Sequence, residues 1–151
     1  MPLPADPPRS PGSPFASMRG HHTGIRYPRF EDALSFWVDK LDWRVLQIWP
    51  YGGLTLAYVM PPDQDDFHLE ILAGPGAVPQ PQFTDVGESL LMSGLNHVCL
   101  SVSDVDATVA ELRARGVEVV GEPFELDDIS ARLAFFRDPW GNFFEISQRL
   151  D

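Results

Sequence analysis

The chain has 151 residues, 44% of them hydrophobic, which is enough for one domain or for two small modules with a buried core. Its formal net charge of −11, from 11 basic and 22 acidic residues, argues against nucleic acids and anionic membranes as partners. A single cysteine excludes an intrachain disulfide. Because the sequence also lacks a membrane-length apolar run and a secretory signal pattern, we expect a cytoplasmic protein.

Proline-rich segments divide the chain. Residues 1–17 contain six prolines, a composition that predicts a disordered tail outside the fold. Residues 74–93 contain three more prolines and few periodic apolar residues, which is typical of a linker. The remaining segments, 18–73 and 94–151, are similar in length, and we expect each to form one module.

In the first module, residues 22–27 have the pattern of a strand, and a helix is expected from about Glu31. A left-handed residue at Asp42 would follow the helix. Residues 54–60 and the segment around Glu70 are predicted strands, separated by a turn at residues 62–63. The buried face of the helix is expected to hold Ala33, Leu34, Trp37 and Leu41.

The second module repeats this order. A strand begins at His97, and Ser103 with Asp106 has the form of a capping box at the start of a helix. The helix would bury Val105, Val109 and Leu112 and end at Gly116. Strands are predicted from residue 117, over 132–137 and around Glu145, with a turn at 138–141. The shared pattern is βαβββ, twice, which is an α+β fold.

Two histidine–glutamate pairs recur at one interval. His22 and Glu70 are 70 − 22 = 48 residues apart, and His97 and Glu145 are also 145 − 97 = 48 residues apart. The second pair therefore follows the first at one constant offset, about half the chain. Each glutamate lies inside an apolar strand pattern, where an unpaired carboxylate costs several kcal/mol. Two such carboxylates, each matched to a histidine, suggest a shared metal ion.

Strand alternation predicts which way these side chains point. Successive residues of a strand face opposite sides, so the four candidates lie on the face away from the purely apolar set. The alternation favours His22 over its neighbour His21, which should face the helix side or solvent. Arg26, His68 and Cys99 share the candidate faces, and we consider them weaker substrate-binding candidates.

Three motifs carry a family resemblance: HTGI at residues 22–25, LNHV at 95–98 and, most distinctive, FRDPWGNFFEI at 136–146. With these motifs the chain resembles the vicinal oxygen chelate superfamily, the group of glyoxalase I, bleomycin resistance proteins and extradiol dioxygenases. The resemblance covers about residues 19–149. It implies that the two tandem βαβββ modules curl into a cup-shaped, mostly antiparallel eight-stranded sheet.

The resemblance also implies one divalent metal ion per site, held by the first and last strands of each module. The ligand positions match His22, Glu70, His97 and Glu145, a donor set that suits Ni²⁺, Co²⁺, Zn²⁺, Mn²⁺ or Fe²⁺. No organic cofactor is expected. In glyoxalase I-like members a glutamate transfers a proton between neighbouring carbons. Glu145 matches that catalytic base, and Glu70 is its counterpart in the first module.

We therefore expect a glyoxalase-like enzyme of the isomerase, epimerase or lyase type, acting on a small carbonyl or 2-oxo compound through a metal-stabilised enolate. Two alternatives stay open on the same scaffold. One is an Fe²⁺-dependent dioxygenase, although ring-cleaving members normally carry a different residue at the position of Glu70. The other is a non-catalytic resistance protein that binds a drug.

The charge pattern bears on the substrate. Arg26 falls where glyoxalase I-like members place a glutathione-binding arginine, but residues 125–128 are acidic where an anion-binding loop would be basic. Lys40 is the only lysine. A neutral or cationic small molecule is therefore favoured. We expect a homodimer, in which the metal site lies within one chain or is shared between subunits.

Overall fold

The computed structural model describes residues 5–150, and its contacts divide the chain into two units, residues 5–78 and 79–150. The division falls between Val78 and Pro79, inside the proline-containing segment 74–93. Within the described residues, no helix is both long and apolar enough to span a membrane.

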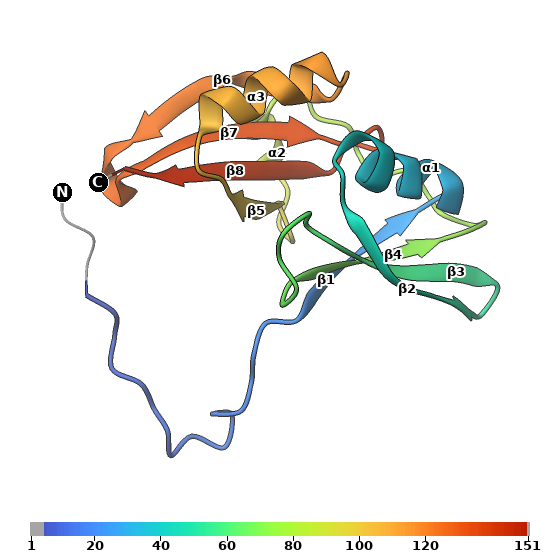
Figure 1. Cartoon of the computed structure of the whole chain (residues 1–151), viewed down its shortest axis with the longest axis horizontal. Helices are drawn as coiled ribbons and strands as arrows, with labels where there is room; N and C mark the ends of the chain where they lie inside the picture. Colours follow the sequence, from blue (N-terminus) through green and yellow to red (C-terminus); the bar gives the residue numbers. More distant parts are fainter. Residues whose placement is uncertain (1–4, 151) are drawn as a thin grey trace. The chain divides into compact units, whose positions relative to one another are not determined.

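The first unit contains one βαβββ module. Residues 5–21 form turns but no helix or strand (Figure 1). The elements that follow are β1 (His22–Tyr27), α1 (Phe30–Leu34), the π-helical segment η1 (Ser35–Lys40), β2 (Arg44–Tyr51), β3 (Leu54–Met60) and β4 (His68–Ala73). The strands form one sheet in the order β1-β4-β3-β2, in which only the β1–β4 pairing is parallel.

The helix of this unit buries a different set of side chains from the one predicted. Ala33 and Trp37 are buried as expected, but Phe36 is buried in place of Leu34 and Leu41, which are only partly buried. The expected face assumed 3.6 residues per turn, whereas the wider π-helical turn of η1 changes the face that meets the sheet. The prediction at Leu34 and Leu41 was therefore wrong.

The second unit repeats the module. Its elements are α2 (Val86–Ser89), β5 (His97–Ser101), α3 (Val105–Ala114), β6 (Glu118–Leu126), the 3₁₀ turn η2 (Asp127–Ile129), β7 (Ala131–Arg137) and β8 (Phe143–Arg149). The strand order β5-β8-β7-β6, again with one parallel pair, is that of the first unit. The predicted α+β class with two βαβββ modules is confirmed, and each module has a four-stranded sheet of its own.

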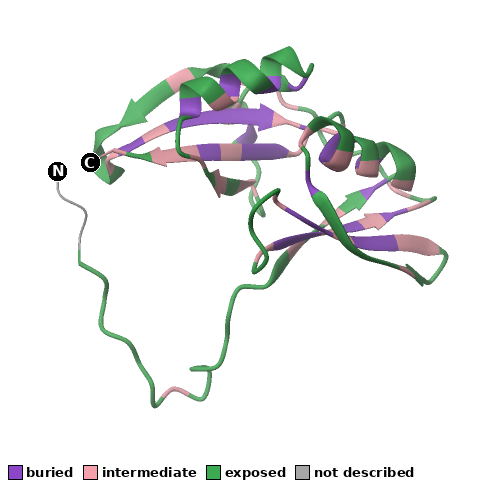
Figure 2. Ribbon diagram, viewed as in Figure 1, coloured by how far each residue is buried: buried purple, intermediate pink, exposed green. Residues whose placement is uncertain are grey.

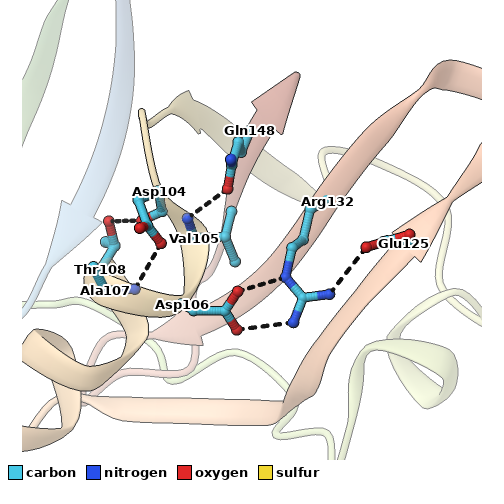
Figure 3. Close-up of polar contacts among 8 residues, drawn as sticks. All are labelled: Asp104, Val105, Asp106, Ala107, Thr108, Glu125, Arg132 and Gln148. Carbon is cyan, nitrogen blue, oxygen red and sulfur yellow. Dashed lines mark hydrogen bonds and ion pairs between the residues drawn. The ribbon is translucent and has the colours of Figure 1, made fainter. Parts of the chain in front are cut away.

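Polar contacts fix α3 on its sheet (Figure 3). The helix begins at Asp104, whose side chain accepts a hydrogen bond from the Ala107 N–H, so the expected cap at Ser103 was wrong. Gln148 of β8 accepts from the Val105 N–H. Arg132 of β7 donates to both oxygens of Asp106, and these hydrogen bonds hold the pKa of Asp106 below its usual value. The contacts from Gln148 and Arg132 therefore set the start of the helix against the sheet that carries Glu145.

The core of each unit lies between its helix and its inner strands. Figure 2 and the burial pattern place most buried strand residues on the inner strands β3, β4, β7 and β8, while β2 and much of β6, two of the four edge strands, are exposed. In the second unit Phe136 and Phe144 stack with their ring centroids 5.1 Å apart. In the first unit the Trp37 Nε1–H donates to the Tyr27 hydroxyl, so these fully buried rings are paired.

Candidate functional site

The first and last strands of the first unit bring His22 and Glu70 together. In the parallel β1–β4 ladder, His22 lies opposite His68 and Gly24 lies opposite Glu70, so the candidate pair is diagonal across the two strands. His22 Nε2 lies 3.4 Å from Glu70 Oε2. A Cβ at position 24 would lie 3.1 Å from Cδ1 of Leu72, a tight contact, and 3.4 Å from Oε2 of Glu70, an ordinary contact distance.

The second unit holds the equivalent pair in the same register. His97 lies opposite Phe143 and Cys99 lies opposite Glu145, and His97 Nε2 is 3.2 Å from Glu145 Oε2. The register positions of the two units differ by the same offset that separates the two pairs in the sequence. The spacing found in the sequence therefore corresponds to one local structure built twice.

The alternation argument holds on all four strands. On β4, Leu69 and Ile71 are buried in the core while Glu70 is only partly buried, and on β8 Phe144 and Ile146 flank Glu145 in the same way. The two glutamate side chains nevertheless keep only 17% and 15% of their surface exposed. A carboxylate this far removed from water needs a nearby cation or donor.

His21 lies closer to the site than expected. It precedes β1 and is exposed, but its Nδ1 is 2.8 Å from Nδ1 of His22. Its ring centroid lies 5.1 Å from that of His68 and 5.9 Å from that of Tyr58. His21 is thus exposed to solvent, which is one of the two orientations expected for it, and it also contacts His22, because strand alternation does not extend to a residue before the strand.

His68 is the most enclosed polar side chain of this group. It is 7% exposed, and its Nδ1 is buried with no hydrogen-bond partner within the described chain. Its ring lies beside Tyr58, which also contacts His22 with a centroid distance of 5.2 Å. His68 is thus placed beside the candidate ligands with one ring nitrogen unsatisfied.

The equivalent positions in the second unit are apolar. Phe143 takes the register position of His68, and Phe135 takes that of Tyr58, opposite the glutamate of its own sheet. The ring of Phe135 meets His97 edge-on at a centroid distance of 5.4 Å. The two histidine–glutamate pairs therefore have the same geometry but different neighbouring side chains. We call His68 and Tyr58 the polar wall of the first unit, and their equivalents, Phe143 and Phe135, form an apolar wall in the second.

Cys99 and Arg26 have partners inside their own units. The Cys99 thiol donates to Glu145 Oε1 at 3.2 Å. Burial, then the hydrogen bond and charge of Glu145, raise the pKa of Cys99 to about 12, so the thiol stays protonated. The Arg26 guanidinium donates to the backbone carbonyls of Tyr27, Leu72, Gly74 and Pro75. Arg26 thus ties the ends of β1 and β4 together through backbone carbonyls.

Sequence reasoning missed α2 and the residues next to it. Asp85 caps this short helix by accepting from the Glu88 N–H, and Glu88 Oε2 accepts from the Thr84 N–H. The spacing of Asp85 and Glu88 is that of a capping box, a signal present in the sequence but hidden in a segment assigned as linker. The helix presents Ser89 to Asn96, and Asn96 contacts His97.

The histidine–glutamate pairs fit a divalent ion. Two donors bound about 2.1 Å from one ion lie roughly 3.0 Å apart at a right angle and roughly 3.4 Å apart at the tetrahedral angle. The distances of 3.4 and 3.2 Å fall in this interval, at or beyond the long end of an ordinary N–H···O hydrogen bond. Within residues 5–150, no three His, Cys, Asp or Glu side chains gather closely enough to hold an ion, so each unit by itself supplies one histidine and one glutamate.

The family of the chain follows from its sequence. A model of the glyoxalase/bleomycin resistance protein/dioxygenase superfamily matches residues 19–146, which include both pairs. The chain belongs to this superfamily.

The similar proteins carry names of different kinds, one of an enzyme and one of a binding protein. The chain is 30% identical over 130 residues to a "Probable lactoylglutathione lyase" of Synechocystis sp., covering 84% of this chain and 92% of that protein. A glyoxalase family protein from Enterococcus faecalis has a similar fold, with a TM-score of 0.71, 22% identity and coverage of 87% and 98%. TnmS3, an antibiotic binding protein from Streptomyces sp. CB03234, matches with a TM-score of 0.59, 25% identity and coverage of 87% and 97%.

Proposed function

We propose that this protein is a divalent-metal-dependent enzyme of the glyoxalase type, which transfers a proton within a small carbonyl or 2-oxo compound. The observation that carries the proposal is the repeated pair, in which an imidazole Nε2 and a largely buried carboxylate Oε2 face each other at 3.4 and 3.2 Å. The relative named a probable lactoylglutathione lyase supports an enzyme rather than a binding protein.

In this proposal His22, Glu70, His97 and Glu145 hold one ion. When bound, the ion would supply Lewis acidity, which stabilises negative charge on a substrate oxygen. Glu145 acts as the general base that takes the proton from carbon, and Glu70 is its counterpart. Cys99 donates to Glu145 Oε1, which keeps that oxygen oriented while Oε2 faces His97.

Substrate contacts are proposed on the polar wall of the first unit. His68 brings a buried, unsatisfied Nδ1, and Tyr58 brings an aromatic face beside His22. Arg26 uses its guanidinium on backbone carbonyls, which weakens its case as a ligand for an anionic substrate. With a net charge of −11, the chain favours a neutral or cationic small molecule in the cytoplasm.

Metal binding is the first test. Because a ligand that binds only the folded state stabilises it by about 2.7 kcal/mol at one hundred times its Kd, added Ni²⁺ or Zn²⁺ should raise the unfolding free energy measurably. We expect His97→Ala and Glu145→Gln to abolish this gain. Glu122→Gln, which changes an exposed glutamate of β6, should retain it. A wild-type protein that gains no stability from Ni²⁺, Co²⁺, Zn²⁺, Mn²⁺ or Fe²⁺ would contradict the proposal.

The reaction type is tested by a substrate screen. Carbonyl, 2-hydroxy and 2-oxo compounds, together with lactoylglutathione because of the relative's name, are incubated with the protein loaded with Ni²⁺, Co²⁺, Zn²⁺, Mn²⁺ or Fe²⁺. We expect turnover with Ni²⁺ or Co²⁺ under nitrogen. Turnover only with Fe²⁺ and with consumption of oxygen would instead assign the dioxygenase alternative.

A drug-binding role is the second candidate, because TnmS3 is described as an antibiotic binding protein and shares this fold. A binder of this kind needs no metal, so tight binding of an aromatic drug by metal-free protein, without turnover, would favour it. The assembly proposed for either role is a homodimer, which light scattering of the purified protein measures directly.

A further inference from the structure

The residue directly before each candidate ligand histidine contacts Nδ1 of that histidine. In the first unit the contact is His21 Nδ1 to His22 Nδ1, and in the second it is Asn96 Oδ1 to His97 Nδ1, both at 2.8 Å. Since each immediately precedes its histidine, His21 and Asn96 occupy equivalent positions in the two modules. In both histidines Nδ1 thus contacts the preceding residue, while Nε2 faces a glutamate.

The hydrogen bonds around Asn96 have only one consistent direction. The Ser89 hydroxyl donates its single hydrogen to the Val86 carbonyl at 2.6 Å, so its oxygen can only accept from Asn96. The Asn96 Nδ2 amide therefore points to Ser89, at 3.0 Å, and Oδ1 points to His97. Because Oδ1 can only accept, Nδ1 of His97 must carry the hydrogen. Ser89 is 3% exposed, so bulk water does not compete at its hydroxyl.

This direction has a consequence on the other side of the ring. In the neutral imidazole with its hydrogen on Nδ1, Nε2 carries a lone pair and no hydrogen, so it is an acceptor. Nε2 lies 3.2 Å from Oε2 of Glu145, which is also an acceptor. Two acceptors at this distance repel each other unless a proton on Nε2 or a metal cation lies between them. The contact from Asn96 therefore prepares Nε2 to coordinate a positive ion.

We propose that Asn96, oriented by Ser89, is a positioning residue that keeps the hydrogen of His97 on Nδ1 and so presents Nε2 to the divalent ion. This inference rests on the proposed metal-dependent function. The first unit lacks the same device, because the ring nitrogen of His21 can donate or accept and does not impose a direction on His22. The half-site of His97 and Glu145 is thus set before metal binds.

The tautomer is measured in full-length, metal-free protein. Long-range ¹H–¹⁵N correlation spectra at mildly alkaline pH report which ring nitrogen carries the hydrogen, and the His97 signals are assigned by comparison with His97→Ala. We expect the hydrogen on Nδ1 in the wild type and a loss of this preference in Asn96→Ala. An Nε2–H tautomer in the wild type would overturn the inference.

Metal affinity provides a second readout, by competition for Zn²⁺ with a chromophoric chelator. Losing the group that orients a ligand histidine typically weakens binding by about 10- to 100-fold, which we expect for Asn96→Ala. Asn96→Asp keeps an acceptor for Nδ1 and should bind like the wild type, and Ser89→Ala should fall between. Gln148→Ala removes a hydrogen bond to α3 in the same unit and serves as the matched control, with unchanged affinity expected.

The outcomes separate the inference from the function on which it rests. Wild-type protein that binds no divalent ion contradicts the proposed function. Wild-type protein that binds Zn²⁺ tightly, with a folded Asn96→Ala variant that binds it equally well, overturns the role of Asn96 alone. Folding of each variant is checked by its thermal unfolding midpoint.

Discussion

At the scale of single residues, His68 distinguishes the two halves of the protein. It is nine-tenths buried with an unsatisfied Nδ1, while its equivalent in the second unit, Phe143, is an aromatic side chain with no polar atom. A buried polar group without a partner costs about 1–3 kcal/mol. A sequence that keeps this cost at a site beside two candidate ligands is best explained by a use for the imidazole.

The substitution His68→Phe tests that use. Because it replaces the imidazole with the residue of the second unit and removes the unsatisfied nitrogen, we expect the unfolding free energy to rise by about 1 kcal/mol. Turnover of a substrate found by the screen should fall, mainly through a higher KM. Urea unfolding and steady-state kinetics measure the two effects. A less stable variant with normal kinetics would show that His68 is a structural residue.

At the scale of elements, the start of α3 shows how a one-residue difference escapes a sequence pattern. Ser103 and Asp104 are both good capping residues, and the acidic Asp106 three residues after Ser103 favoured the serine. In the structure Asp104 has the extended backbone of an N-cap and accepts from the Ala107 N–H. The choice is made by the docking of the helix, because Gln148 and Arg132 hold Val105 and Asp106 on the sheet.

Matched alanine variants separate the two caps. Asp104→Ala should lower the unfolding free energy by about 1 kcal/mol, because it leaves a helix N–H without its acceptor. Ser103→Ala should change it by only a few tenths of a kcal/mol. Chemical denaturation of both variants gives the comparison. Equal losses, or a larger loss at Ser103, would contradict the assignment of the cap.

At the scale of the whole molecule, the chain is two copies of one module with the same strand order and register. Each copy carries one imidazole and one carboxylate at a distance suited to a shared ion. Since borderline divalent ions are usually held by at least three protein ligands, neither pair alone is a complete site. The proposed function therefore requires the two pairs to act on one ion.

The stoichiometry of metal binding tests this requirement. We expect one tightly bound ion per chain, measured by isothermal titration calorimetry and by elemental analysis after desalting. His22→Ala and His97→Ala should each remove that ion entirely, because each takes away one of four donors. Two ions per chain, each lost independently, would mean that the pairs bind separately.

The amino-acid sequence by itself determined the α+β class, the repeated βαβββ order and the pairing of His22 with Glu70 and of His97 with Glu145. These features are local or periodic: alternation places the side chains on a strand face, and a repeated spacing reveals the duplicated ladder. Only the tertiary structure decided that Phe36 replaces two leucines in the core, that His21 lies beside His22, and that Ser89 and Asn96 stand behind His97. The first of these depends on the π-helical turn η1, the second on a residue that precedes strand β1, and the third on the short helix α2 in the segment expected to be a linker. A strand or helix period carries no information about them.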